Sequence, residues 1–363
     1  METLLINWVY HRPVGHVIEA MRLARDFAAA NDQLEVSLLL NRESPIELAR
    51  CHPSISRVYP IDLDRGLPKG LPREWDYVFT FPDVGTNGEA PLLDRFHEAF
   101  RAWVHARAVN DGWKPETMPP RKFAPLRLQL PEKERREAES RCGEASPRLS
   151  VLLAAGSHTR APTLKFWSAL FERFFERHLE GEVFLLGSFD RKRSFTRGIS
   201  PKEIESLTRT FPRVRNAFDI GLLAQLAIAE RCQLHISPHS GMSFAVQAAG
   251  VPWLAIAGQQ WWEFLLNGVP LVSIFPSCPL YPCFREMYPE CESLLRKQLR
   301  TPCMDDEALF AKMPEIVDAM ESLLDGSISY RDSAYWHEEA LRSRLGDGSI
   351  LDWPHVVSDD YRF

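Results

Sequence analysis

Short apolar runs alternate with amphipathic segments along the first third of the chain. The apolar runs are rich in β-branched and large aliphatic residues, which predicts β-strands. The segments between them carry apolar residues at helical spacing. The expected strands are Leu4–Val9, Leu34–Leu40, Arg57–Ile61 and Asp76–Phe81, and the expected helices are His16–Ala30 and Pro45–Cys51. This alternation is typical of a parallel sheet with crossover helices in a Rossmann-like order.

The middle of the chain breaks this pattern. Pro91–Ala106 has helical spacing, whereas Asn110–Leu130 is proline-rich and is expected to run irregularly along an edge or a cleft. Glu132–Pro147 is charged and helix-prone and contains Gly143. We place a domain boundary at its end.

The strand and helix alternation then begins again. The expected elements are Leu149–Ala154, Leu164–His178, Val183–Leu186, Leu222–Arg231, Gln233–Ile236, Met242–Ala249 and Val251–Ala257. The sequence therefore predicts an α/β protein with two Rossmann-like lobes that face each other across a ligand-binding cleft. The lobes are residues 1–147 and 148–325, and the tail 326–363 is a candidate to cross back onto the first lobe.

The amino-acid composition limits the binding partners and the cellular compartment that can be expected for this chain. The net charge of −6 is spread along the chain, which argues against a nucleic-acid surface. Met1–Val9 enters an apolar strand without the features of a secretory signal, and no apolar run approaches the ~20 residues of a membrane span. The seven cysteines are an odd number, which favours a reducing compartment. We expect a cytoplasmic protein, and peripheral contact with the inner face of the membrane stays open.

The loop between the first strand and the first helix is the first candidate site. Tyr10–His16 lies where open α/β sheets place ligands, at the carboxyl end of a strand. Gly15 permits close backbone approach, and the imidazole of His16 is suited to take a proton from a hydroxyl nucleophile. The same histidine equally fits a residue that caps or packs the helix.

Two further turns are candidate phosphate sites, since a turn of small residues before a helix offers backbone donors to an anion. The first contains Gly156, Ser157 and Arg160 and is followed by Lys165, a point charge for a diphosphate; a solvated helix start is the alternative. The second follows the strand Gln233–Ile236 and precedes a helix of small residues. Its candidate ligands are His239, Ser240, Gly241 and Ser243.

The run from Pro238 to Pro252 resembles glycosyltransferase family 9, the lipopolysaccharide heptosyltransferases of the GT-B fold. The family pattern, approximately N-D-[ST]-G-P-x-H-x-A-A-A-L-G-x-P, fits it without gaps. Val14–Ile18, Thr163–Trp167 and Phe218–Gly221 also resemble family segments, as does the cysteine-bearing loop Cys278–Met304. The resemblance thus covers most of the chain.

This resemblance implies an inverting, metal-independent transfer of a sugar from a nucleotide-diphosphate donor to an acceptor hydroxyl, with His16 as the base and no cofactor. The acceptor would be a glycan, a lipopolysaccharide core or a small molecule. Its implied nucleotide-binding residues are Gly187, Ser188, Phe218, Asp219 and Gly221. Candidates for contact with the acceptor or the sugar are Gly15, Asp83, Asn110, Asp111, Gln259 and Gln260.

Three positions depart from the family pattern. His16 stands where the family has its catalytic aspartate, His239 replaces the motif aspartate and Phe244 replaces the motif histidine. Several other GT-B enzymes carry a Gly-His pair in the first loop, so the first change is compatible with a change of base. The changes at His239 and Phe244 leave the identity of the donor sugar undetermined.

A zinc site is not expected at the four clustered cysteines, Cys278, Cys283, Cys291 and Cys303. They are separated by four, seven and eleven residues and lack a C-x₂-C pair.

Two functions other than sugar transfer are also compatible with the sequence. A nucleotide-sugar hydrolase or epimerase would use the Gly-His loop on water or for proton movement, and a non-catalytic sugar-nucleotide-binding protein would account for the lost aspartates.

Overall fold

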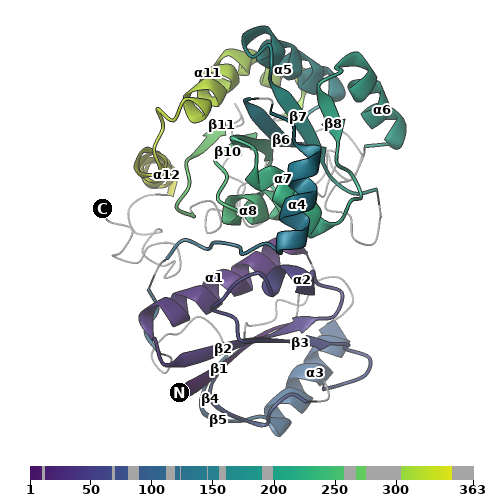
Figure 1. Ribbon diagram of the computed structural model, residues 1–363. Helices are drawn as coiled ribbons and strands as arrows, with labels where there is room; N and C mark the ends of the chain where they lie inside the picture. The colour runs from purple at the N-terminus through teal and green to yellow at the C-terminus, as the bar shows by residue number, and fades with distance from the viewer. Residues whose placement is uncertain are drawn as a thin grey trace. The chain divides into compact units, whose positions relative to one another are not determined.

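The computed structural model describes residues 1–9, 13–67, 70–80, 90–111, 119–122, 124–144, 146–154, 161–189, 199–256, 267–274 and 304–345. The chain forms two compact units that divide between Gln129 and Leu130. Each unit contains one parallel sheet with helices packed on it (Figure 1).

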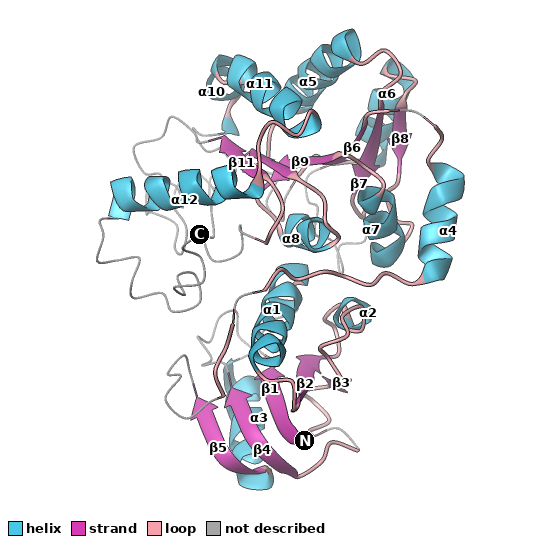
Figure 2. Cartoon of the chain, turned by 60° about the vertical axis from the view of Figure 1, so that its left-hand side comes forward, coloured by secondary structure: helices cyan, strands magenta, loops and turns pink. Residues whose placement is uncertain are grey.

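The first unit has a five-stranded sheet in the order β3-β2-β1-β4-β5. Every pairing in it is parallel. Helices α1 and α2 lie on one face of the sheet and α3 on the other (Figure 2). The strands are β1 (Glu2–Trp8), β2 (Leu34–Asn41), β3 (Arg57–Ile61), β4 (Glu74–Thr80) and β5 (His105–Asp111); the helices are α1 (Val14–Ala30), α2 (Ile46–Ala49) and α3 (Ala90–Trp103).

Burial explains why β1 occupies the centre of this sheet. Leu4, Leu5 and Ile6 are fully buried, so both faces of β1 are covered, as in strands at the middle of parallel sheets. The sequence places apolar residues at all three successive positions. A continuous apolar run is therefore the correct signal for this strand, rather than alternation.

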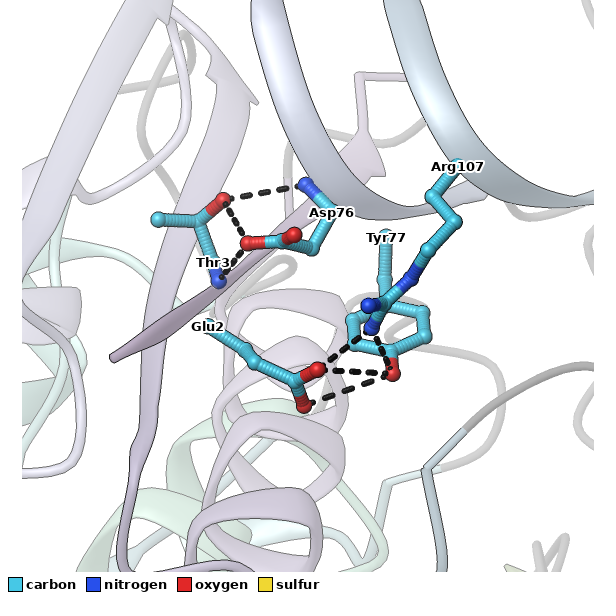
Figure 3. Close-up of polar contacts among 5 residues, drawn as sticks. All are labelled: Glu2, Thr3, Asp76, Tyr77 and Arg107. Carbon is cyan, nitrogen blue, oxygen red and sulfur yellow. Dashed lines mark hydrogen bonds and ion pairs between the residues drawn. The ribbon is translucent and has the colours of Figure 1, made fainter.

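Polar side chains tie β1, β4 and β5 together (Figure 3). Thr3 donates to Asp76 Oδ2 from its backbone N (2.8 Å) and from Oγ1 (3.1 Å), and the Asp76 amide donates back to Thr3 Oγ1. The hydrogen bond from the Thr3 amide lowers the pKa of Asp76. Arg107 donates to Glu2 and to the Tyr77 hydroxyl. Arg107 is exposed on the edge strand β5, where a charged side chain discourages the addition of another strand.

The prediction of a helix over Pro91–Ala106 is wrong at its end, because α3 stops at Trp103 and His105–Asp111 forms β5. The position of β5 at the edge of the sheet explains why this strand was predicted as part of a helix. Several residues of β5 are exposed, including His105 and Arg107, so the strand lacks the apolar run that marks its neighbours.

The second unit has a six-stranded sheet in the order β11-β10-β9-β6-β7-β8, again with only parallel pairings. Its strands are β6 (Arg148–Leu152), β7 (Glu182–Leu186), β8 (Val214–Asn216), β9 (Leu234–Pro238), β10 (Trp253–Ile256) and β11 (Leu271–Ile274). Its helices are α4 (Glu132–Arg141), α5 (Leu164–Arg177), α6 (Pro201–Thr210), α7 (Leu222–Glu230), α8 (Gly241–Ala248), α10 (Asp306–Ala311), α11 (Met313–Leu324) and α12 (Tyr330–Leu345).

Helix α5 contributes four aromatic residues to the core of this unit. Phe166, Trp167, Phe171 and Phe174 of α5 are fully buried against the sheet, and Trp167 Nε1 donates to the Leu153 carbonyl. The indole nitrogen therefore keeps a hydrogen bond while the ring is buried.

Hydrogen bonds also attach the outer helices of the second unit. Arg135 of α4 makes a two-bond ion pair with Glu230 of α7. Ser333 of α12 accepts a hydrogen bond from the Leu271 amide at the start of β11 (2.8 Å). The first part of the predicted tail thus packs on the second sheet, and residues 346–363 lie outside the described residues. No helix in the described part of the chain is long and apolar enough to cross a membrane.

Candidate functional site

Both sheets have a topological switch point, where the chain leaves the centre of the sheet in opposite directions. In the first unit it lies between β1 and β4, and in the second between β6 and β9. Ligands of open α/β sheets bind outside the carboxyl ends of the strands at such points. The turn from β1 to α1 and the turn from β9 to α8 are therefore the places where these units would bind ligands.

His16 lies at the first of these points, as the third residue of α1. The N-cap of α1 is Pro13, whose side chain makes no capping hydrogen bond. The imidazole Nδ1 lies 3.1 Å from Glu19 Oε2, one turn further along. His16 and Gly15 were predicted from the sequence and Glu19 was not, although its i+3 spacing from His16 was a readable signal.

The surroundings of this pair keep it uncharged. The side chain of His16 is 32% exposed and that of Glu19 only 14%. Burial still lowers the pKa of His16 to about 4 and raises that of Glu19 to about 8, where Arg22 partly offsets the rise. The positive end of α1 also disfavours an imidazolium. At neutral pH a neutral imidazole therefore faces a protonated carboxyl group.

Glu19→Gln should make folding less sensitive to pH. The folded pKa of Glu19 is raised, so its contribution to stability is full below about 4.5 and is lost as the pH rises towards 8. The glutamine variant should lie within about 0.5 kcal/mol of the wild type at pH 4.5 and exceed its stability by roughly 4 kcal/mol at pH 8, since the pKa rises from 4.5 to about 8 on folding and each pH unit in that range contributes about 1.4 kcal/mol. Urea unfolding at several pH values measures this difference. A variant that becomes less stable than the wild type as the pH rises would show that an ionised Glu19 stabilises the fold.

The turns after β7 and β8 are joined by hydrogen bonds. Asp219 Oδ1 accepts from Ser188 Oγ (2.6 Å) and from the Phe189 amide (3.0 Å), and the Asp219 amide donates to the Gly187 carbonyl (3.1 Å). Asp219 has a left-handed φ of 60°, which aspartate tolerates better than most residues. The structure thus brings together the predicted nucleotide-binding residues Gly187, Ser188, Phe218, Asp219 and Gly221, of which Gly221 is the N-cap of α7.

Gln225 and Phe189 complete this pair of turns. The Gln225 amide accepts from the Gly187 N–H (2.7 Å) and donates to the Gly187 carbonyl (3.0 Å), and the side chain is buried. The Phe189 ring stacks on Phe218 with centroids 4.7 Å apart. The sequence analysis missed both. A glutamine within the otherwise apolar run of α7 was the available signal, because buried amides need specific partners.

The turn from β9 to α8 forms the second switch-point site. Ser240 is the N-cap, and its Oγ accepts from the Ser243 amide (3.2 Å). The first turn of α8 contains no acidic residue, so nothing there opposes an anion at the positive end of the helix. The predicted residues Ser240, Gly241 and Ser243 therefore lie together.

His239 precedes this N-cap and packs among aromatic rings. Its imidazole stacks on Trp253 (centroids 5.9 Å apart) and meets the Phe244 ring edge-on at 5.0 Å. The two departures in this motif, His239 and Phe244, are thus in contact. Together with Trp253 they form an aromatic cluster beside the turn.

Lys165 is the second residue of α5, whose N-cap is Thr163. Its side chain is exposed, and Nζ lies 5.2 Å from the centre of the Phe310 ring in α10. An ammonium over a ring face gains roughly 0.5–1 kcal/mol at exposed sites. This contact gives Lys165 a fixed place in the second unit, and its proposed role at a diphosphate stays a prediction.

Several predicted residues lie outside the described residues: Gly156, Ser157, Arg160, Asp83, Gln259, Gln260 and the cysteines Cys278, Cys283, Cys291 and Cys303. Asn110 and Asp111 are described only as the backbone at the end of β5. Within the described ranges, no group of three or more metal-binding side chains occurs. The cysteines of those ranges, Cys51, Cys142 and Cys232, are buried free thiols whose pKa values are raised by burial.

Comparison with known proteins supports the fold. No protein-family model matches the sequence, and no curated protein matches it. Among solved structures, ADP-heptose lipopolysaccharide heptosyltransferase II of Escherichia coli is 13% identical, with a TM-score of 0.57 over 90% of this chain and 99% of that one. A family 9 glycosyl transferase from Veillonella parvula is also 13% identical, with a TM-score of 0.55 over 89% and 97%. The predicted GT-B fold, resembling family 9, is confirmed.

Proposed function

We propose that the chain is a glycosyltransferase that moves a sugar from a nucleotide-diphosphate donor to an acceptor hydroxyl. One observation carries the proposal. On a fold shared with family 9 enzymes, the second unit places an anion-compatible helix N-terminus at its switch point, and two hydrogen-bonded turns follow the neighbouring strands β7 and β8. A nucleotide diphosphate needs both features, one for its phosphates and one for its nucleoside.

The donor would bind to the second unit. The diphosphate would accept hydrogen bonds from the first N–H groups of α8 beside Ser240, and Lys165 would add a positive charge. The nucleoside would lie against the turns that contain Gly187 and Asp219. One similar structure is that of an ADP-heptose lipopolysaccharide heptosyltransferase, so ADP-linked sugars are the first donors to test.

The first unit would supply the base. The acceptor oxygen attacks the anomeric carbon, the bond from that carbon to the diphosphate oxygen breaks, and the imidazole of His16 takes the hydroxyl proton. One displacement of this kind inverts the anomeric centre. A neutral imidazole is required for this step; the low pKa of His16 keeps the ring neutral across the physiological range and at the same time reduces its basicity. The α8 dipole would stabilise the leaving diphosphate without a metal ion.

A thermal-shift screen against ADP-, GDP-, UDP-, CDP- and dTDP-linked sugars tests the donor site, because a ligand that binds the folded state raises its Tm. We expect one nucleotide to raise the Tm and Lys165→Ala to weaken that shift. The matched control is Lys202→Ala, an exposed lysine at the start of α6. If no nucleotide raises the Tm, the donor site is wrong.

Product analysis separates the remaining functions. With donor alone, a hydrolase releases free sugar and an epimerase a changed donor, whereas a transferase needs an acceptor. A non-catalytic binding protein would bind the donor as tightly after His16→Ala and turn it over in neither form.

A further inference from the structure

A chain of buried hydrogen bonds runs beneath the turn from β9 to α8. Trp253 Nε1 donates to Ser237 Oγ (2.8 Å), and Ser237 Oγ lies 2.6 Å from Ser243 Oγ. Ser243 Oγ lies 3.3 Å from His235 Nε2, and His235 Nδ1 lies 3.0 Å from the Ser150 carbonyl oxygen. These side chains are fully buried.

The carbonyl at one end favours one direction for this chain. His235 Nδ1 lies 3.0 Å from both the Ser150 carbonyl oxygen and Ser150 Oγ. A proton on Nδ1 satisfies the carbonyl, which only accepts, and Nε2 then accepts from the Ser243 hydroxyl. The indole N–H only donates, so the Ser237 hydroxyl accepts a hydrogen bond from Trp253 and donates one to Ser243 Oγ. Burial lowers the pKa of His235 to about 3, so the imidazole stays neutral.

Ser243 connects the chain to the helix N-terminus. Its Oγ lies 2.8 Å from Ser240 Oγ, and its backbone N–H donates to that same Ser240 oxygen. The side chain of the N-cap is therefore held by a residue whose own rotamer is set by His235. The N–H groups of Gly241 and Met242 come before the first intrahelical hydrogen bond and point out of the helix.

We infer that His235 is a positioning residue for the donor diphosphate, because through Ser243 it fixes Ser240 and the direction of the N–H groups of Gly241 and Met242. This inference rests on the proposed donor site. His235 itself touches no ligand. Its role depends on an acceptor at Nε2, and this dependence distinguishes it from a histidine that merely fills the core.

Two variants separate the two nitrogens of the ring. Glutamine places an amide oxygen close to the position of Nε2 and keeps the acceptor for Ser243. Asparagine reaches only the position of Nδ1, keeps the bond to Ser150 and removes the acceptor at Nε2, which leaves the Ser243 hydroxyl the longer contact with the Pro238 carbonyl (3.5 Å). His235→Asn and Ser243→Ala should weaken binding of inorganic diphosphate, measured by titration calorimetry, by about tenfold or more, and His235→Gln by less than about threefold. With an active donor, KM should rise while kcat is unchanged.

Hydrogen exchange gives a second measurement that needs no ligand. The amides of Ser243 and Phe244 donate to Ser240, so they should exchange faster in His235→Asn than in His235→Gln. Equal diphosphate affinity in the two variants, or equal exchange at these amides, would overturn the inference. If the wild type binds neither inorganic diphosphate nor any nucleotide while the exchange rates still differ, the donor site is wrong and His235 positions the turn for another purpose.

Discussion

Replacing His16 by alanine should lower kcat by about 10²–10⁴-fold and leave donor binding unchanged, because a general base contributes about this much and acts only in the chemical step. The imidazole lies in the first unit, at the carboxyl end of β1, whereas the proposed donor residues belong to the second unit. The assay combines the donor identified by thermal shift with an acceptor, and it measures kcat and the donor Kd separately.

His105→Ala is the matched control for this experiment. His105 belongs to the same unit and is also hydrogen-bonded to a glutamate, Glu74 (3.1 Å), but it lies at the amino end of β5. Removing it should leave kcat within about twofold of the wild type, since surface substitutions away from a site have small effects. Equal loss of activity in both variants, or none after His16→Ala, would exclude His16 as the base.

The sequence predicted most of the buried elements of the fold because burial leaves a continuous apolar run in the chain. Strands β1, β2 and β7 were found on this basis, and each is buried over most of its length. Strand β8 was missed because it has three residues, of which only Val214 is buried. Helix α6 was also missed, although Ser200 and Glu203 form a capping box before its amphipathic stretch.

The candidate site was partly predictable for a different reason. Turns between a strand and a helix are visible as small residues after an apolar run, which identified Ser240 and Gly241, whereas Gly187 was implied by the resemblance to family 9. Their supporting residues, Gln225 and His235, lie elsewhere in the sequence and meet the turns only after the sheet forms. A polar residue within an apolar segment indicates a buried hydrogen bond, but the sequence does not identify its partner.

Gly187→Ala should destabilise the second unit by about 3 kcal/mol and abolish the nucleotide-dependent rise in Tm. A Cβ at this position would lie 2.4 Å and 2.5 Å from Cζ and Cε1 of Phe218. That ring is buried and stacked on Phe189, so the backbone of the turn must move instead. Movement would weaken both hydrogen bonds between Gly187 and Gln225 and displace Ser188 from Asp219.

Two further variants test whether the clash with Phe218 causes the loss of stability in Gly187→Ala. Gly143→Ala adds the same methyl group in the same unit where nothing lies within 4 Å, so its stability should stay within about 0.5 kcal/mol of the wild type. Adding Phe218→Leu to Gly187→Ala removes the atoms that clash and should recover part of the stability. If the double variant is no more stable than Gly187→Ala alone, the clash with Phe218 is not the cause. Nucleotide binding that survives Gly187→Ala would instead mean that the nucleoside does not lie against this turn.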